Sequence, residues 1–151
     1  MPKKYGLLTE HQLRVLKLRS RGLSLREIAS KLGTSHQNIA VIEKRALENI
    51  ETAKQTLLAY KLATAPLKIR IDEGIKLVEI PRIIMDEADK NKLKVKGDFT
   101  LIFKLIRFKA RKCVAENKVK EPIMIIVDQN GEIDVYPYKD IEQLYNQIQE
   151  L

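Results

Sequence analysis

Residues 24–46 read SLREIASKLGTSHQNIAVIEKRA. Ser24 and Glu27 form a Ser-x-x-Glu capping box, which is typical of the start of a helix. Gly33 permits a tight turn after this short helix, and Ser35 is placed to cap a longer one. A short helix, a glycine-containing turn and a longer helix make up the helix-turn-helix unit. The stretch therefore predicts such a unit.

A further capped helix precedes this stretch. Thr9 and Gln12 form a Thr-x-x-Gln capping box, and Gly22 is expected to end the helix. We expect the three helices to enclose a small core, with Ala29 where the second and third helices cross closely. The other apolar residues predicted for this core are Leu13, Leu16, Leu23, Leu25, Ile28, Leu32, Ile39 and Ile42, and Val15 is a further candidate on the first helix.

The charge of the chain is unevenly distributed. The 151 residues carry a net charge of +8. Residues 1–65 contain 12 Lys and Arg against 5 Asp and Glu, whereas residues 66–151 contain 16 against 15. A basic module beside a near-neutral one indicates that the first module meets a polyanion.

The start of the third helix offers side chains that can read bases. In helix-turn-helix proteins this part of the last helix enters the major groove of double-stranded DNA. Gln37 and Asn38 can each pair with N6 and N7 of adenine, and Ala40 and Val41 can contact a thymine methyl group. His36 can donate to a base edge or to a phosphate. The alternative is that these are ordinary polar residues of a first helical turn.

A second set of residues is predicted to hold the phosphate backbone. Lys44 and Arg45 lie one or two turns along the third helix and are expected to neutralise phosphates. Ser24 and Arg26, with the free amides at the start of the second helix, offer a separate phosphate anchor. Ser35, the cap of the third helix, completes the predicted DNA-binding set.

Four motifs carry a family resemblance: LTEHQ at 8–12, LSLREIA at 23–29, LGTS at 32–35 and IEKRA at 42–46. Together they resemble the DNA-binding segment of bacterial sigma-factor C-terminal regions and LuxR-type regulators. Longer polar residues stand in the sigma-factor pattern at the positions of Ala40 and Val41. A sigma-like promoter preference is therefore not expected.

The chain is also similar, over a greater length, to the Tfx family of archaeal DNA-binding proteins. This similarity extends into the second half through EIPRII at 79–84 and EAD at 87–89. It implies a transcription regulator with an N-terminal helix-turn-helix and a family-specific C-terminal domain.

The third helix is expected to continue as a connector from His36 to about Thr64, roughly 40 Å at 1.5 Å per residue. Pro66 disfavours helix at the residue before it. One stripe of the connector is apolar and needs a partner. We favour the same helix in a second subunit, which would give a homodimer; the alternative is that the C-terminal domain folds back on it. The stripe contains Ala46, Ile50, Ala53, Leu57, Tyr60 and Thr64.

The pattern changes after Pro66 and predicts a small α+β domain over residues 66–151, joined by the long helix to an all-α domain over residues 1–65. The overall fold class is therefore α+β. Expected strands cover 67–71, 75–78, 93–96, 123–127 and 133–135, and expected helices cover 81–91, 99–115 and 140–148, the last capped by Asp140.

Little in the sequence indicates catalysis. Both histidines fall in the DNA-binding part and Cys113 is the single cysteine, so a Cys/His metal set cannot form. Asp86, Glu87 and Asp89 could suggest a metal site, but a solvated acidic helix face explains them better. Neither a glycine-rich phosphate loop nor a nucleophile elbow occurs. We expect no enzyme activity and no cofactor.

The cysteine content and the N-terminus bear on location and function. One cysteine fits a reducing cytoplasm, where an unreactive structural thiol is favoured over a redox sensor. The N-terminus does not resemble a signal peptide.

The leading interpretation is a dimeric, sequence-specific regulator that binds double-stranded DNA. The alternatives are an adaptor that binds polymerase and a DNA-targeted enzyme. A small-molecule effector of the second domain is possible, although no pocket is evident from the sequence.

Overall fold

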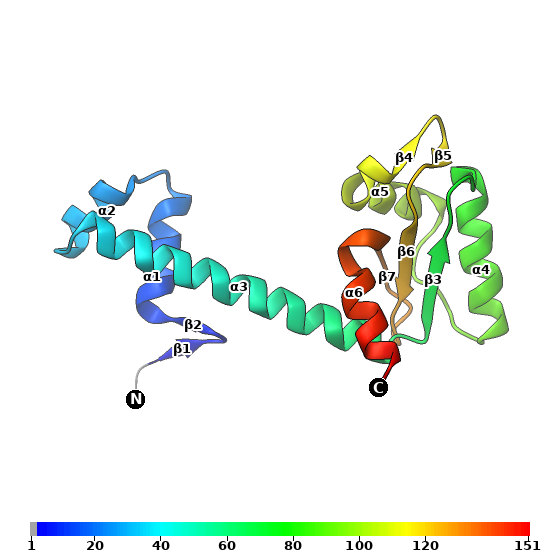
Figure 1. Ribbon diagram of the computed structural model, residues 1–151, viewed down its shortest axis with the longest axis horizontal. Helices are drawn as coiled ribbons and strands as arrows, with labels where there is room; N and C mark the ends of the chain where they lie inside the picture. The colour runs from blue at the N-terminus through cyan, green and yellow to red at the C-terminus, as the bar shows by residue number, and fades with distance from the viewer. Residues whose placement is uncertain (1–2) are drawn as a thin grey trace. The chain divides into compact units, whose positions relative to one another are not determined.

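The computed structural model describes residues 3–151. The chain divides into two compact units between Leu57 and Leu58, and each unit is described separately. The first contains β1 (Lys4–Tyr5), β2 (Leu8–Thr9), α1 (Glu10–Ser20), α2 (Leu25–Leu32) and the larger part of α3 (His36–Thr64). The second contains a three-stranded antiparallel sheet with helices (Figure 1). The predicted α+β class is confirmed.

Both predicted capping boxes are present. The Thr9 hydroxyl accepts from the Gln12 backbone N–H at 3.1 Å, and the Gln12 side chain accepts from the Thr9 N–H at 3.0 Å. Ser24 and Glu27 make the same pair of bonds at 3.1 and 3.3 Å. These bonds satisfy N–H groups that have no partner inside a helix, so α1 and α2 begin where their caps lie.

The core of the first unit differs in one respect from the prediction. Val15 and Leu18 of α1 are buried in it, together with Ile28, Ala29 and Ile39, whereas the predicted Leu13 is 36% exposed. Helix α1 carries two apolar pairs at i, i+3 spacing, 13/16 and 15/18, and either could face inward. The burial shows that the second pair does.

A short hairpin precedes α1 and was not predicted. Strands β1 and β2 pair Lys4 with Thr9 and Tyr5 with Leu8. The side-chain amide of Asn49 on α3 donates to the Leu7 carbonyl at 3.1 Å. The hairpin is thereby attached to α3 within the first unit.

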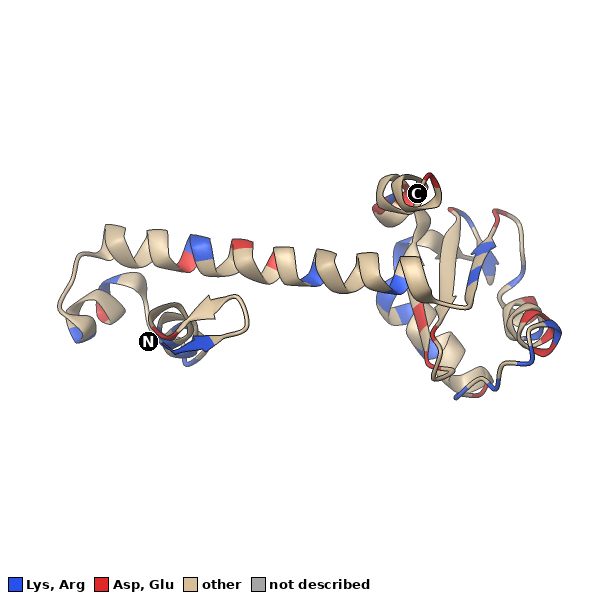
Figure 2. Cartoon of the chain, turned by 90° about the horizontal axis from the view of Figure 1, so that it is seen from below, with Lys and Arg blue, Asp and Glu red and all other residues tan. Residues whose placement is uncertain are grey.

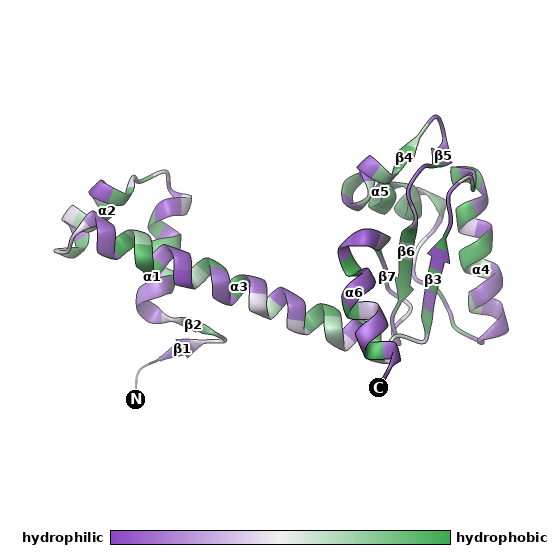
Figure 3. Ribbon diagram, viewed as in Figure 1, coloured by the Kyte–Doolittle hydropathy of each residue, from purple (hydrophilic) through white to green (hydrophobic). Residues whose placement is uncertain are grey.

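The second unit is built on three antiparallel strands in the order β3 (Leu67–Ile71), β6 (Ile123–Val127), β7 (Ile133–Pro137). Every residue of β6 is buried, and this strand is continuously hydrophobic in Figure 3. A strand shows no hydrophobic alternation when both of its faces are covered. The sheet is therefore the middle layer of three.

The two faces of β6 contribute to different cores, because successive side chains of a strand point to opposite faces. Ile123, Ile125 and Val127 pack in a cluster with residues of α4 (Ile80–Lys90) and α5 (Phe99–Lys109). Met124 and Ile126 pack in the other cluster, with residues of α6 (Tyr138–Gln149) and with the end of α3. Leu58, Leu62 and Ala65 are the α3-side members of this second cluster.

Several predicted elements of the second unit were wrong. Residues 75–78 form no strand: Lys76 makes a single bridge to Lys118, and a 3₁₀ turn, η1 (Leu77–Glu79), follows it. Residues 93–96 likewise contribute only a single bridge, at Lys96. The helix predicted to reach residue 115 ends at Lys109. Asp140 lies in the first turn of α6, whose N-cap is Pro137. After α5 come η2 (Arg111–Cys113), β4 (Val114–Ala115) and β5 (Lys118–Val119).

The early end of α5 follows from long-range packing. Cys113 is buried, and its carbonyl accepts from the backbone N–H groups of Lys120 and Glu121. Glu116 and Asn117 adopt positive φ values of 53° and 62°, as in the two-residue turns that close hairpins. Asn117 was the sequence signal for this turn, and the helix-favouring residues around it obscured it.

The connector helix is continuous from His36 to Thr64, as predicted. The structure divides the chain within it, because Leu58, Leu62 and Ala65 belong to the second unit's core. The division of function between residues 1–65 and 66–151 stays a prediction. Within residues 3–151, no helix has the length and apolar character needed to cross a membrane.

Candidate nucleic-acid interface

The predicted reading surface is the start of α3. The Ser35 hydroxyl accepts from the Asn38 backbone N–H at 3.2 Å and caps the helix. Gln37, Asn38 and Val41 are exposed, whereas His36 and Ala40 are half-buried. Ile39, between them, is fully buried in the core of the first unit. The helix is thus held by its inner side and presents the polar residues to solvent.

The side chain of Asn38 is oriented by a neighbour that the sequence analysis did not select. The Asn38 Nδ2 donates to the Thr34 hydroxyl at 3.0 Å. This bond uses one of the two amide hydrogens and leaves the other hydrogen and Oδ1 available, which are the two groups that pair with adenine. Thr34 therefore orients the amide without blocking the predicted base contact.

The predicted phosphate contacts Lys44 and Arg45 are exposed on the same helix. Neither takes part in an ion pair among residues 3–151. Their charges are not neutralised by the protein itself, so they remain available to an anionic ligand.

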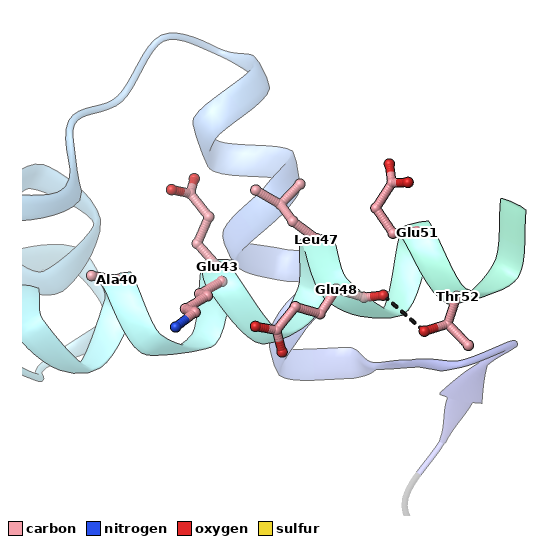
Figure 4. Close-up of a pocket in the computed structure, with 7 residues that line it drawn as sticks. Ala40, Glu43, Leu47, Glu48, Glu51 and Thr52 are labelled. Carbon is pink, nitrogen blue, oxygen red and sulfur yellow. Dashed lines mark hydrogen bonds between the residues drawn. The ribbon is translucent and has the colours of Figure 1, made fainter. Parts of the chain in front are cut away.

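Beyond Arg45 the exposed side of α3 becomes acidic. A groove of about 590 Å³ runs along the helix from Ala40 to Thr52, and Glu48 and Glu51 lie in its part beyond Arg45 (Figure 4). Carboxylates repel phosphates, so the surface suited to DNA ends near Arg45. Acidic residues follow the basic ones along this helix in Figure 2. The groove is lined by Ala40, Glu43, Lys44, Leu47, Glu48, Glu51 and Thr52.

An ion pair between α1 and α3 fixes the reading helix in the first unit. Arg19 Nε lies 2.6 Å from a Glu43 carboxylate oxygen, and an Arg19 terminal nitrogen donates to the Leu23 carbonyl at 3.1 Å. One guanidinium thus joins α1, the turn after it and α3. The sequence analysis did not select this pair, because no local spacing connects Arg19 with Glu43.

The second predicted phosphate anchor is the start of α2. Ser24 and Arg26 are both exposed. The Ser24 oxygen accepts the Glu27 N–H, and its own hydrogen stays free to donate to a phosphate oxygen. The positive end of the helix dipole favours an anion here, although the Glu27 carboxylate of the capping box occupies part of the same space.

The second unit contains a half-buried charge cluster that the sequence analysis missed. The side chain of Asp134 is 13% exposed and accepts from Lys109 at 2.5 Å, from Lys61 at 3.0 Å and from the Tyr136 hydroxyl at 2.8 Å. Burial alone would raise the pKa of Asp134, but these hydrogen bonds outweigh it and hold the pKa below its ordinary value of 3.8. The cluster joins α3, α5 and β7.

The cysteine and the acidic residues that were considered for redox or metal chemistry are buried or lie apart from one another. Cys113 is 1% exposed, and burial raises the pKa of its thiol, which disfavours the reactive thiolate. Glu87 pairs with Lys90 at 3.2 Å. Across residues 3–151, no three His, Cys, Asp or Glu side chains gather as metal ligands.

Residues 53–135 match the family model described as "DNA_binding protein, TFX, C-term". The chain belongs to the Tfx family of DNA-binding proteins. Its Tfx relatives include the "DNA-binding protein Tfx" of Methanothermobacter marburgensis, which is 38% identical over 87% of this chain and 96% of its own length. The homologous protein of Methanothermobacter thermautotrophicus has the same name and the same figures.

A further Tfx relative comes from Methanocaldococcus jannaschii and is named "Putative transcriptional regulatory protein". It is 44% identical over 86% of this chain and 95% of its own length. The matched lengths include both the helix-turn-helix and the second unit. The predicted Tfx resemblance is therefore confirmed.

Proposed function

We propose that this chain is a transcription regulator that binds double-stranded DNA in a sequence-specific manner, with the first turns of α3 in the major groove. The observation that carries the proposal is the combination of an exposed, pre-oriented Asn38 with Lys44 and Arg45 on the same helix, which form no ion pair within residues 3–151. Family membership and the names of its relatives support it. The predicted set includes Ser24, Arg26, Ser35, His36, Gln37, Asn38, Ala40, Val41, Lys44 and Arg45.

The two groups of residues have different expected effects. Base contacts give specificity, whereas phosphate contacts strengthen binding to every sequence. Replacing Asn38 by Ala should cost about 1–3 kcal/mol on the preferred sequence and little on others. Replacing Lys44 by Ala should weaken binding to all duplexes alike and lower the salt slope by about 1.

The test begins with selection of preferred duplexes from a random pool by the full-length protein. Affinities for selected and scrambled duplexes are then measured by fluorescence anisotropy across a salt series, for the wild type, Asn38→Ala and Lys44→Ala. Lys54→Ala is the matched control, since Lys54 lies on the same helix beyond Glu48 and Glu51. Enrichment of no sequence, or equal loss from Asn38→Ala on both duplexes, would contradict the proposal.

We also infer that the regulator is a homodimer. On the apolar stripe of α3, Ala46 is buried within its own unit, but Leu57 and Tyr60 are 64% and 63% exposed. A second copy of the helix would cover them, and two reading heads would then bind two half-sites. Leu57→Lys should yield a monomer by light scattering, whereas Val78→Lys, at a 72% exposed site, should not. A monomeric wild type at micromolar concentration would contradict this.

We further propose that the protein acts in the cytoplasm, where it meets DNA, and that it acts by binding rather than by catalysis. Incubation of the protein with Mg²⁺ and plasmid should therefore leave the plasmid intact. The effector of the second domain stays a prediction. A cavity of about 250 Å³ beside Lys61, Lys109 and Asp134 is where a ligand-induced thermal shift would be sought.

A further inference from the structure

The second unit is near-neutral as a whole, but its charge is locally concentrated. Residues 104–112 read KLIRFKARK, with five Lys and Arg and no Asp or Glu. Lys109 is engaged with Asp134. Lys104, Arg107, Arg111 and Lys112 form no ion pair within residues 3–151. Among these residues, the end of α5 and the turn after it therefore present four cations without an ion-pair partner.

An aromatic side chain lies among these cations. Phe108 is 87% exposed, more than any other large apolar side chain of residues 3–151 except the terminal Leu151. Single exposed apolar residues are common on protein surfaces. The distinguishing observation is the groove of about 670 Å³ whose lining consists of Phe108 and the three cations Lys104, Arg107 and Arg111.

We propose that this groove, which we call the α5 groove, binds an unpaired DNA strand. The charge of the groove is complementary to a phosphate backbone, and the ring offers a face on which a base can stack. Stacking on an aromatic side chain between backbone-binding cations is the way in which proteins bind single strands. Lys104 and Arg107 lie one turn apart on α5, about 4.5 Å along its axis at 1.5 Å per residue, and Arg111 follows in the turn after the helix.

The observations favour an unpaired strand over a duplex and over an acidic protein. In a duplex the bases are already stacked, and insertion of Phe108 would carry the cost of unstacking a base step. An acidic protein would satisfy the cations but would give no reason for an exposed aromatic ring between them. The choice of DNA rather than RNA rests on the proposed function, because α3 brings the chain to DNA, which transcription opens locally.

The test measures binding of a fluorescent oligodeoxythymidine of about 15 nucleotides to the full-length protein by anisotropy. Phe108→Ala should weaken binding about 5- to 150-fold, the range for loss of one stacked base. Phe108→Tyr should retain the affinity. Phe99→Ala is the matched control, since Phe99 is on the same helix and 57% exposed but does not line the groove. A 2-aminopurine base in the oligonucleotide should lose fluorescence on binding to the wild type and not to Phe108→Ala.

Further measurements show which surface of the protein binds the strand and which ligand it prefers. Lys44→Ala should leave single-strand binding nearly unchanged; if it removes binding while Phe108→Ala does not, the strand binds at the helix-turn-helix and the α5 groove is ruled out. Tighter binding to RNA of the same length, to random duplex or to polyglutamate than to single-stranded DNA would overturn the assignment. Thermal unfolding of each variant confirms that it folds. Failure to select any preferred duplex would refute the reading function of α3 and leave this result standing.

Discussion

The unit with α1 and α2 buries five side chains in one core, whereas the unit around β6 buries clusters on both faces of a sheet. The first is held by two capping boxes and by one ion pair from α1 to α3. The second is held by strand pairing between residues more than fifty positions apart, such as Ile69 and Ile125. The surface that we propose to meet DNA is thus built on a small core with strong local signals, and a larger core supports the second unit.

The largest expected effect comes from the middle of the larger core. Ile125 is fully buried in the central strand, so Ile125→Ala should lower the free energy of unfolding by about 2–5 kcal/mol through lost contacts and a cavity. Chemical denaturation followed by circular dichroism measures it, with Val78→Ala at an exposed site as control. A loss below about 1 kcal/mol would show that the sheet is not the centre of this unit.

The next effect tests the smaller core. Ala29 is 5% exposed and packs with Ile28 and Ile39, so Ala29→Leu should cost about 1–3 kcal/mol by overpacking. Duplex binding should fall with it, while the methyl NMR signals of the β6 core stay in place. Ser30→Ala, at the next position, which is exposed, should change neither the stability nor duplex binding. Loss of the β6 signals in Ala29→Leu would show that the two units do not unfold separately.

The charge cluster of the second unit gives a pH-dependent effect. Because the pKa of Asp134 is lowered in the folded protein, its carboxylate stabilises the fold above pH 3.8 and loses this contribution as the pH falls through the folded value. Asp134→Asn should cost about 1–3 kcal/mol at pH 7, as expected for hydrogen bonds to a charged group, and much less at an acid pH below the lowered pKa of the folded protein. An effect of equal size at both values would contradict the ionic role. Denaturation of both proteins at the two pH values measures it.

The smallest effect concerns a helix cap. Ser24→Ala removes the bond to the Glu27 N–H and should cost about 1 kcal/mol in the first unit. Ser24→Asn should keep most of the stability, since Asn is also a good cap. If Ser24→Ala lowers duplex affinity and leaves stability unchanged, Ser24 acts on phosphate and not as a cap.

Local signals predicted the first unit well for a physical reason. A capping box involves residues three positions apart, and a glycine turn involves one or two residues. The helix ends marked by Thr9, Ser24 and Gly33 can therefore be predicted from short stretches of sequence. Local sequence did not determine which side of α1 faces the core. Leu13 and Val15 are equally apolar, and only packing against α2 and α3 decides between them.

Long-range terms explain what the sequence did not predict in the second unit. The end of α5 depends on the carbonyl of Cys113 bonding to Lys120 and Glu121. In the Asp134 cluster, Lys61 donates to Asp134, although the two residues are 73 positions apart in the sequence. For the candidate site, exposure of Gln37 and Asn38 followed from helical spacing, whereas the Thr34 contact and the acidic end of the surface became evident only in the structure.

We propose above that the outer side of the first turns of α3 lies against double-stranded DNA. A photo-crosslinking amino acid placed at Val41, and separately at Glu51, tests it directly on the selected duplex. We predict a crosslink to DNA from position 41 and none from position 51, which lies in the acidic groove. A crosslink from 51 alone, or from neither position under conditions where the duplex is bound, would contradict the account.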